Sequence, residues 1–469
     1  MSRRARTRAG TALALAAVVA TGCGEPATDD SADVASAGLT TVTFRLWDET
    51  AADAYRESFD AFNAIHRDIF VEVEVVPAEG YDEQVAADLA DGTMADVFWT
   101  TSDAVAAHAQ GEDILRLNDV LGEDVGPWES SVTDLYTRDG ELWAVPQVWE
   151  ATVLYYNTAL VGQAGVDPTT LTWDPAAVAT LTAPAGPAPE DAGPDAPATQ
   201  SPAATTVAPT DTLRAAVRAL TRDAEGRTAA EEGFDADAVA EYGINADLTA
   251  PDVWLPYLAQ LGGTPRLGAD LDLAGPAAQA TFSYLAELSA IPADRATDPA
   301  RELFAEGRLA LFQSTSGDLR YLAEHAEVDW AIAPVPAGPD GAVSVVDGIG
   351  AAANAAAADP EATSQVLRWL ASTDGQSALA SHSVGVPAAA GAQELFLQAW
   401  ADRGVDASAA LDVDHVVTAV GGPQVEEVLA AVRPVLAETL HGTAALERTL
   451  ADAQEAAEAA LGDEAAKSP

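Results

Sequence analysis

The segment 41–99 alternates between strand-like and helix-like stretches, and this alternation limits the possible folds more than any other feature of the chain. Over 41–47, apolar and polar residues alternate, with Val42, Phe44 and Leu46 on one side, which predicts a half-buried strand. The spacing that follows predicts a helix over 51–65, a strand over 71–75, a helix over 81–89 and a strand over 95–99. This order is typical of an α/β layer with a mainly parallel sheet, in which ligands bind beyond the carboxyl ends of the strands.

The rest of the chain continues with strands and helices after one interruption. The patterns predict strands over 141–145, 152–157, 308–313 and 328–334, a link without strand structure over 146–150, helices beginning at 211 and spanning 359–372, and two helices across 425–461. Residues 183–209 contain seven of the 27 prolines among Ala, Thr, Asp and Gly. Such a composition cannot pack a core, so this segment is predicted to be a disordered surface insertion.

The N-terminus has the parts of a bacterial export signal. Four arginines within the first eight residues precede an apolar run over 11–20, which is far shorter than the roughly 20 residues needed to cross a bilayer. The sequence Ala-Thr-Gly-Cys that ends at Cys23 resembles a lipobox, in which the cysteine is lipidated and becomes the mature N-terminus. We therefore predict a signal peptide at 1–22, a lipidated tether at 23–40, and an extracytoplasmic protein that is lipid-anchored to the cell membrane. A plain secreted protein is the alternative, and the export route, Sec or twin-arginine, stays open.

Composition excludes several classes of function. The chain has 74 acidic and 23 basic residues and a net charge of −51, so it would repel nucleic acid and anionic lipid headgroups. The six histidines lack metal-ligand spacing, and lipidation would use the one cysteine, so we expect no metal site, no cofactor and no thiol nucleophile. Serine-hydrolase, zinc-protease and phosphate-loop motifs are missing, which argues against an enzyme. Acidic residues spread over a solvated surface explain the charge without a cationic ligand.

Several short stretches, in order along the chain, resemble one known family. They are residues 42–49, 91–98, 140–146 with 154–157, 171–174, 306–311 and 334–339. Their order and spacing are similar to those of the family 1 extracellular solute-binding proteins, which deliver carbohydrates to ABC importers. The resemblance runs from Thr41 to about Leu461, interrupted by the proline-rich insertion.

The resemblance implies the two-lobed α/β fold of type II periplasmic binding proteins, with crossing strands as a hinge and the ligand in the cleft between lobes. One lobe would comprise 41–148 and 349–382, and the other 149–348 and 383–465. It also implies a passive, monomeric binding protein, whose partners are a small saccharide and the transmembrane subunits of an ABC permease. Hinge closure around the ligand is a common switching mode in such proteins.

Sugars present C–H faces that pack on aromatic rings and hydroxyls that bind carboxylates and amides. The pair Trp149 and Glu150 is the strongest candidate, because the resemblance places it where the chain first crosses between lobes. Trp47 with Asp48, and Trp99, end predicted strands, although Asp48 could instead cap a helix and Trp99 could be a packing residue. The remaining candidates are Tyr81, Thr101, Tyr155, Trp254, Ser316 and, near the second crossing, Asp347. Apolar surroundings predict that Trp143, Trp173, Trp330 and Trp369 belong to the core.

The family's maltodextrin-binding branch carries a further cleft tryptophan in its C-terminal region and a charged pair after the position of Trp99. Here no tryptophan follows Trp400, and Thr100, Thr101 and Ser102 occupy the place of that pair. We therefore expect a mono-, di- or small oligosaccharide.

Two other interpretations of the candidate site stay open. Trp47, Trp99 and Trp149 with nearby carboxylates would also suit a polyamine or other cation. A secreted glycoside hydrolase would need two suitably spaced carboxyls, which any acidic chain offers.

Overall fold

The computed structural model describes residues 39–122, 128–177, 211–264, 271–289, 299–411, 416–418, 425–440 and 445–465. The predicted signal peptide, Cys23, the tether up to residue 38 and the proline-rich insertion lie outside these residues. Within the described ranges, no helix is both long enough and apolar enough to cross a membrane.

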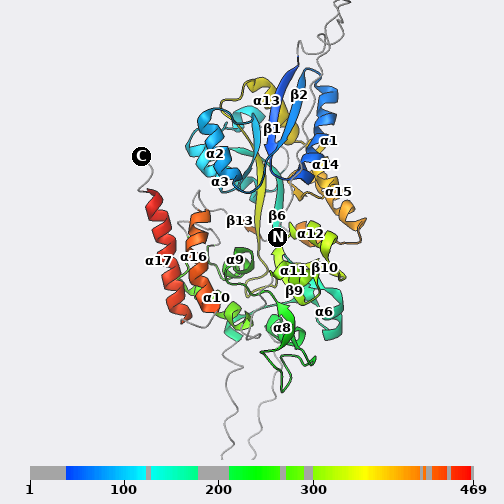
Figure 1. Ribbon diagram of the computed structural model, residues 1–469, viewed down its shortest axis with the longest axis vertical. Coiled ribbons are helices and arrows are strands. Elements are labelled where there is room, and N and C mark those ends of the chain that lie inside the picture. The colour runs from blue at the N-terminus through cyan, green and yellow to red at the C-terminus, as the bar shows by residue number, and fades with distance from the viewer. Residues whose placement is uncertain are drawn as a thin grey trace, which may run out of the picture. The chain divides into compact units, whose positions relative to one another are not determined.

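The N-terminal layer follows the predicted alternation. Strand β1 (Thr40–Leu46) pairs in parallel with β2 (Ile69–Val75) along its whole length and with β3 (Val97–Thr101). Helices α1 (Glu49–Ile65) and α2 (Tyr81–Asp91) connect these strands. Figure 1 shows β1 and β2 side by side with α1 alongside. All five predicted elements of this segment are confirmed.

Two long strands tie the rest of the molecule to this layer. Strand β6 (Ala144–Asn157) pairs antiparallel with β11 (Ser344–Ala353), and β11 also pairs with β3. The predicted break over 146–150 is wrong, because β6 is one continuous strand of 14 residues. Its register with β11 shifts between Ile349 and Gly350, opposite Pro146. A bulge of this kind accommodates a proline, which has no N–H to donate to the ladder.

The two halves of β6 lie in different surroundings. Its first half pairs with β11 and β12 (Val386–Pro387), and its second half pairs with β9 (Leu309–Thr315) and β10 (Trp330–Ala333). Among the described residues, this pairing joins eleven strands into one sheet, with the path β2-β1-β3-β11-β6-β9-β8-β7. The other strands are β4 (Thr137–Arg138), β5 (Glu141–Leu142), β7 (Arg222–Asp223), β8 (Val239–Ile244) and β13 (Val416–Thr418).

Helices cover the sheet on both sides of the crossing strands. The first lobe carries α1, α2, α3 (Ala104–Gln110), α4 (Asn118–Leu121), α5 (Ser130–Asp134), α13 (Pro360–Leu370), α14 (Thr373–Ser381) and α15 (Ala390–Ala401). The second lobe carries α6 (Thr158–Ala164), α8 (Thr212–Leu220), α9 (Pro251–Gln260), α10 (Pro276–Ser289), α11 (Ala300–Ala305), α12 (Asp318–His325), α16 (Val425–Leu440) and α17 (Leu446–Ala465). The predicted two-lobed α/β fold joined by crossing strands is confirmed (Figure 1).

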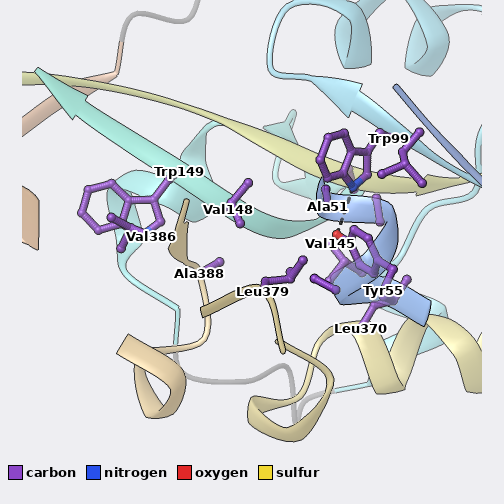
Figure 2. Packing of buried hydrophobic residues seen from close by; sticks show 14 of the residues in the cluster. Ala51, Tyr55, Trp99, Val145, Val148, Trp149, Leu370, Leu379, Val386 and Ala388 are labelled. Carbon is purple, nitrogen blue, oxygen red and sulfur yellow. Dashed lines mark hydrogen bonds between the residues drawn. The ribbon is translucent and has the colours of Figure 1, made fainter. Parts of the chain in front are cut away.

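Apolar side chains form two buried clusters. One contains Phe44, Tyr55 and Trp99, continues along β6 to Phe304 and Phe312 of α11 and β9, and includes Phe396 and Trp400 of α15. Figure 2 shows part of this cluster around Tyr55, Trp99 and Trp149. The other cluster fills the second lobe between its sheet and the helices α8, α9, α10, α16 and α17.

Candidate functional site

Two carboxylates face each other where β6 and β11 cross between the lobes. Glu150 on β6 pairs directly with Asp347 on β11, and the neighbouring Trp149 pairs with Gly348. Directly opposed residues of an antiparallel pair point to the same face of the sheet. The two carboxyl groups therefore lie on one side of the crossing strands.

Both carboxyl groups have raised pKa values. Burial raises the pKa of Glu150, the hydrogen bond from the Thr315 hydroxyl acts against it, and the negative charges of Asp347 and Asp318 add smaller increases. Burial also raises the pKa of Asp347, although the residue is partly exposed and the hydrogen bonds from Ser102 and Gly348 lower that pKa. Like charges on opposed strand residues destabilise a sheet, so strand pairing alone does not account for this pair. Shifted pKa values of this kind cluster at functional sites.

Hydroxyl groups at strand ends hold each carboxylate in place. The Thr315 hydroxyl, at the end of β9, donates to Oε2 of Glu150 over 2.6 Å. The Ser102 hydroxyl, just after β3, donates to Oδ1 of Asp347 over 2.7 Å, and the Gly348 N–H donates to the same oxygen. The carboxylate pair is thus oriented by donors from both lobes.

Asp48 links the first lobe to the second. Its Oδ1 accepts a hydrogen bond of 2.8 Å from the Ala51 N–H and so caps α1. The cap was one of the two roles predicted for Asp48, the other being contact with the ligand. Its Oδ2 lies 2.8 Å from Nη2 of Arg320 on α12. Burial acts to raise the pKa of Asp48, but the hydrogen bonds from Arg320 and Ala51 outweigh it, so the pKa is lowered.

Sequence reasoning missed Asp318, whose negative charge acts on Glu150, and the polar residues around Asp318. The Ser314 hydroxyl donates to Asp318 over 2.6 Å, and Arg301 approaches the same carboxylate at 3.3 Å. Burial raises the pKa of Asp252, at the start of α9, to about 6, with a contribution from the charge of Asp318. The stretch 314–320 follows a predicted strand, and the rule that ligands bind beyond strand ends could have pointed to it.

The aromatic candidates at the ends of β1 and β3 form one cluster. Trp47 is half-buried and lies edge-on to Tyr81 and Trp99, with ring centroids 4.7 and 4.9 Å apart. Trp99 is 2% exposed, and its Nε1 donates to the Tyr55 hydroxyl over 2.9 Å (Figure 2). The Tyr81 hydroxyl donates to the Trp99 carbonyl oxygen. Trp47 is therefore the member of this cluster that a ligand could touch most easily.

The other candidates are packed against protein in this conformation. Trp149 is 1% exposed and lies beside Val386 (Figure 2), and Trp254 is 1% exposed and packs against Phe282 in the second lobe. The Tyr155 ring is buried, and its hydroxyl donates to the Thr315 carbonyl oxygen.

Two further candidates serve the backbone. The hydroxyl of Ser316 accepts from the Ala151 N–H, and that of Thr101 accepts from the Ala104 N–H. Of the four tryptophans expected in the core, Trp143 and Trp173 are buried, and Trp330 and Trp369 are half-buried against it.

One cavity of about 610 Å³ is lined by residues of α10 and of the turn at Pro175 and Ala176, and none of the predicted ligand residues lines it. Within the residues that the structure describes, no group of three or more His, Cys, Asp or Glu side chains could hold a metal ion.

Residues 47–377 match the family model of the bacterial extracellular solute-binding proteins. The chain belongs to this family. Among solved structures, M. tuberculosis UspC is 35% identical to this solute-binding protein, over 90% of this chain and 100% of that one, with a TM-score of 0.73. A search of curated protein sequences found no match.

Two more distant structures share the fold. The cyclic α-maltosyl-1,6-maltose binding protein from Arthrobacter globiformis is 18% identical over 91% of this chain and 100% of that one, with a TM-score of 0.69. Lmo0181 from Listeria monocytogenes, solved in complex with cycloalternan, is 16% identical over 90% and 99%, with a TM-score of 0.67. The predicted family and the extracytoplasmic location of this solute-binding protein are confirmed.

Proposed function

We propose that this solute-binding protein captures a small, uncharged saccharide at the crossing strands and delivers it to an ABC permease. The observation that carries the proposal is the cross-strand pair of Glu150 and Asp347, which strand pairing does not explain. Ionised carboxylates accept strong hydrogen bonds, and a saccharide supplies several hydroxyl donors at once. Binding of a polyol would offset the repulsion that the pair experiences in the free protein.

The side chains around the pair suit a sugar ring. Asp48 and Arg320 add an acceptor and a donor from opposite lobes, and the half-buried Trp47 adds an aromatic surface. The solved structures that share the fold include a cyclic α-maltosyl-1,6-maltose binding protein and proteins solved with cycloalternan or maltotriose bound. Among the predicted ligand residues, we assign the direct contacts to Trp47, Asp48, Glu150 and Asp347. We assign supporting roles to the buried Trp99, Trp149, Tyr155 and Trp254.

The crossing strands act as the hinge in this proposal. The sequence predicted a first lobe of 41–148 and 349–382 and a second lobe of 149–348 and 383–465. Because α15 packs against α14, we extend the first lobe to the end of α15. The ligand favours closure only through contacts that it makes with both lobes at once.

We further propose that Cys23 carries the lipid anchor, that residues 24–40 tether the fold to the membrane, and that the protein works as a monomer without catalysis. Radiolabelled palmitate incorporated into the wild-type chain, but not into Cys23→Ser, would support the anchor. Equal labelling of both chains would reject it.

The test of the ligand class is a thermal-shift screen of the chain from Thr41 onward, against neutral sugars, polyamines and amino acids. A ligand that binds the folded state raises Tm by mass action. We expect a neutral mono-, di- or small oligosaccharide to raise Tm, with an affinity that hardly changes between low and high salt. A polyamine that raises Tm and weakens steeply with salt would overturn the saccharide, and release of free sugar from a glycoside would overturn the lack of catalysis.

A further inference from the structure

The turn between β9 and α12 fits closely around the carboxylate of Glu150. Gly317 lies in this turn with φ −62° and ψ −27°, a conformation that any residue adopts. A Cβ built on Gly317 would lie 2.6 Å from both Cδ and Oε2 of Glu150, and it would overlap Oε1. The glycine is therefore needed for space rather than for backbone conformation.

Thr315, in the same turn, also contacts the Glu150 carboxylate. Its hydroxyl donates to Oε2 of Glu150, and the same Oγ1 accepts from the Gly317 N–H over 3.3 Å. The hydroxyl thus couples the carboxylate to the backbone of the turn. The turn between β9 and α12 therefore donates a hydrogen bond to the Glu150 carboxylate through Thr315. It also leaves room for that carboxylate, because Gly317 has no side chain.

We propose that Thr315 and Gly317 are positioning residues that fix the carboxylate of Glu150 for the ligand and thereby set the affinity of the site. This inference rests on the proposed function, because it assigns Glu150 to the ligand. Hydrogen-bond acceptors must be held within a fraction of an ångström to favour one ligand geometry over another. A displaced carboxylate would keep its charge and lose that geometry.

Gly317→Ala tests the spatial part of the proposal. The overlapping group is the end of a flexible side chain, so the fold accommodates the new methyl group by moving Glu150. The probe is whichever of maltose, trehalose and cellobiose binds the wild type most tightly. We expect its Kd to rise at least about tenfold in Gly317→Ala, with Tm within a few degrees of wild type. Gly162→Ala is the matched control, because Gly162 lies exposed in α6, its φ is not positive, and no atom lies within 4 Å of an added Cβ.

A double-mutant cycle shows whether Gly317 acts through Glu150. If it does, Gly317→Ala weakens binding in the wild type but changes Kd less than about twofold in a Glu150→Gln background. Equal effects in both backgrounds, or an unchanged Kd in the single variant, would overturn the role of Gly317.

Thr315 is tested without any ligand. Loss of its hydroxyl removes a hydrogen bond that lowers the pKa of Glu150, so Thr315→Val should raise that pKa and Thr315→Ser should restore it. Carboxyl ¹³C NMR, with Glu150→Gln to assign the signal, measures this directly. An unchanged pKa in Thr315→Val would overturn the role of Thr315. If no neutral sugar of the thermal-shift screen binds the wild type, the saccharide class is wrong, and the NMR titration still decides whether Thr315 positions Glu150.

Discussion

The ends of β1 and β3 and the crossing strands both carry acidic and aromatic side chains, but their energetics differ. At the strand ends, Asp48 caps a helix and pairs with Arg320, and Trp99 has its indole nitrogen hydrogen-bonded to Tyr55. Asp48 and Trp99 thus each have a partner that stabilises the fold. At the crossing, Glu150 and Asp347 face each other with raised pKa values. A site that opposes folding points to function more clearly than one that supports it.

The largest expected effect tests the structural side of this comparison. Trp99→Ala removes a large buried ring and leaves Tyr55 without its donor, so it should lower the free energy of unfolding by about 3–5 kcal/mol. Urea unfolding followed by circular dichroism measures the change. Trp47→Ala, which removes a half-buried ring of the same type, should lose less than half as much. Similar losses in the two variants would contradict the assignment of Trp99 to the core.

The next largest effect concerns the carboxylate pair at the crossing strands. Glu150→Gln and Asp347→Asn should each weaken saccharide binding at least about tenfold, or about 1.4 kcal/mol, because a neutral amide accepts weaker hydrogen bonds. Unfolding in urea should show equal or slightly higher stability, because the repulsion between the opposed charges is removed. Calorimetry that finds undiminished affinity in both variants would move the site away from the crossing. Trp149→Ala is a poor test of the site alone, since it also opens a cavity.

A smaller effect depends on pH. The pKa of Asp252 is about 6 in the folded protein, against an ordinary value of 3.8. Between these two pH values the folded state keeps a proton that the unfolded state releases. The contribution of Asp252 to stability is therefore fully present below about pH 4 and is lost as pH rises through about 6. Asp252→Asn should consequently gain stability over wild type at pH 7 and not at pH 4. An equal difference in the free energy of unfolding between Asp252→Asn and wild type at pH 4 and at pH 7 would refute this.

The smallest effect is the ion pair between lobes. Because Asp48 and Arg320 are partly exposed, a double-mutant cycle with Asp48→Asn and Arg320→Gln should give a coupling of about 0.2–1 kcal/mol in the free energy of unfolding. The coupling should shrink in high salt. A coupling above about 2 kcal/mol would mean that this pair, rather than the ligand, holds the lobes together.

Local patterns were enough to predict much of this molecule. Alternation over 41–47 and helical spacing over 51–65 predicted β1 and α1, because side-chain periodicity depends only on neighbouring residues. Asp48 at the start of α1 was recognised as a possible cap for the same reason. The order of short stretches along the chain predicted the two-lobed fold and the family, which the match over 47–377 confirmed.

Tertiary structure decided what local patterns could not. Strand β6 runs through Pro146 because it bulges at the neighbouring Gln147, and Glu150 lies opposite Asp347 because two distant strands adopt one register. Whether an indole is exposed depends on what covers it: Trp47 and Trp149 have the same side chain, yet the first is half-buried and the second is sealed beside β12. Periodicity reports which face of an element is apolar, but only the packing of distant segments determines which polar groups on that face meet.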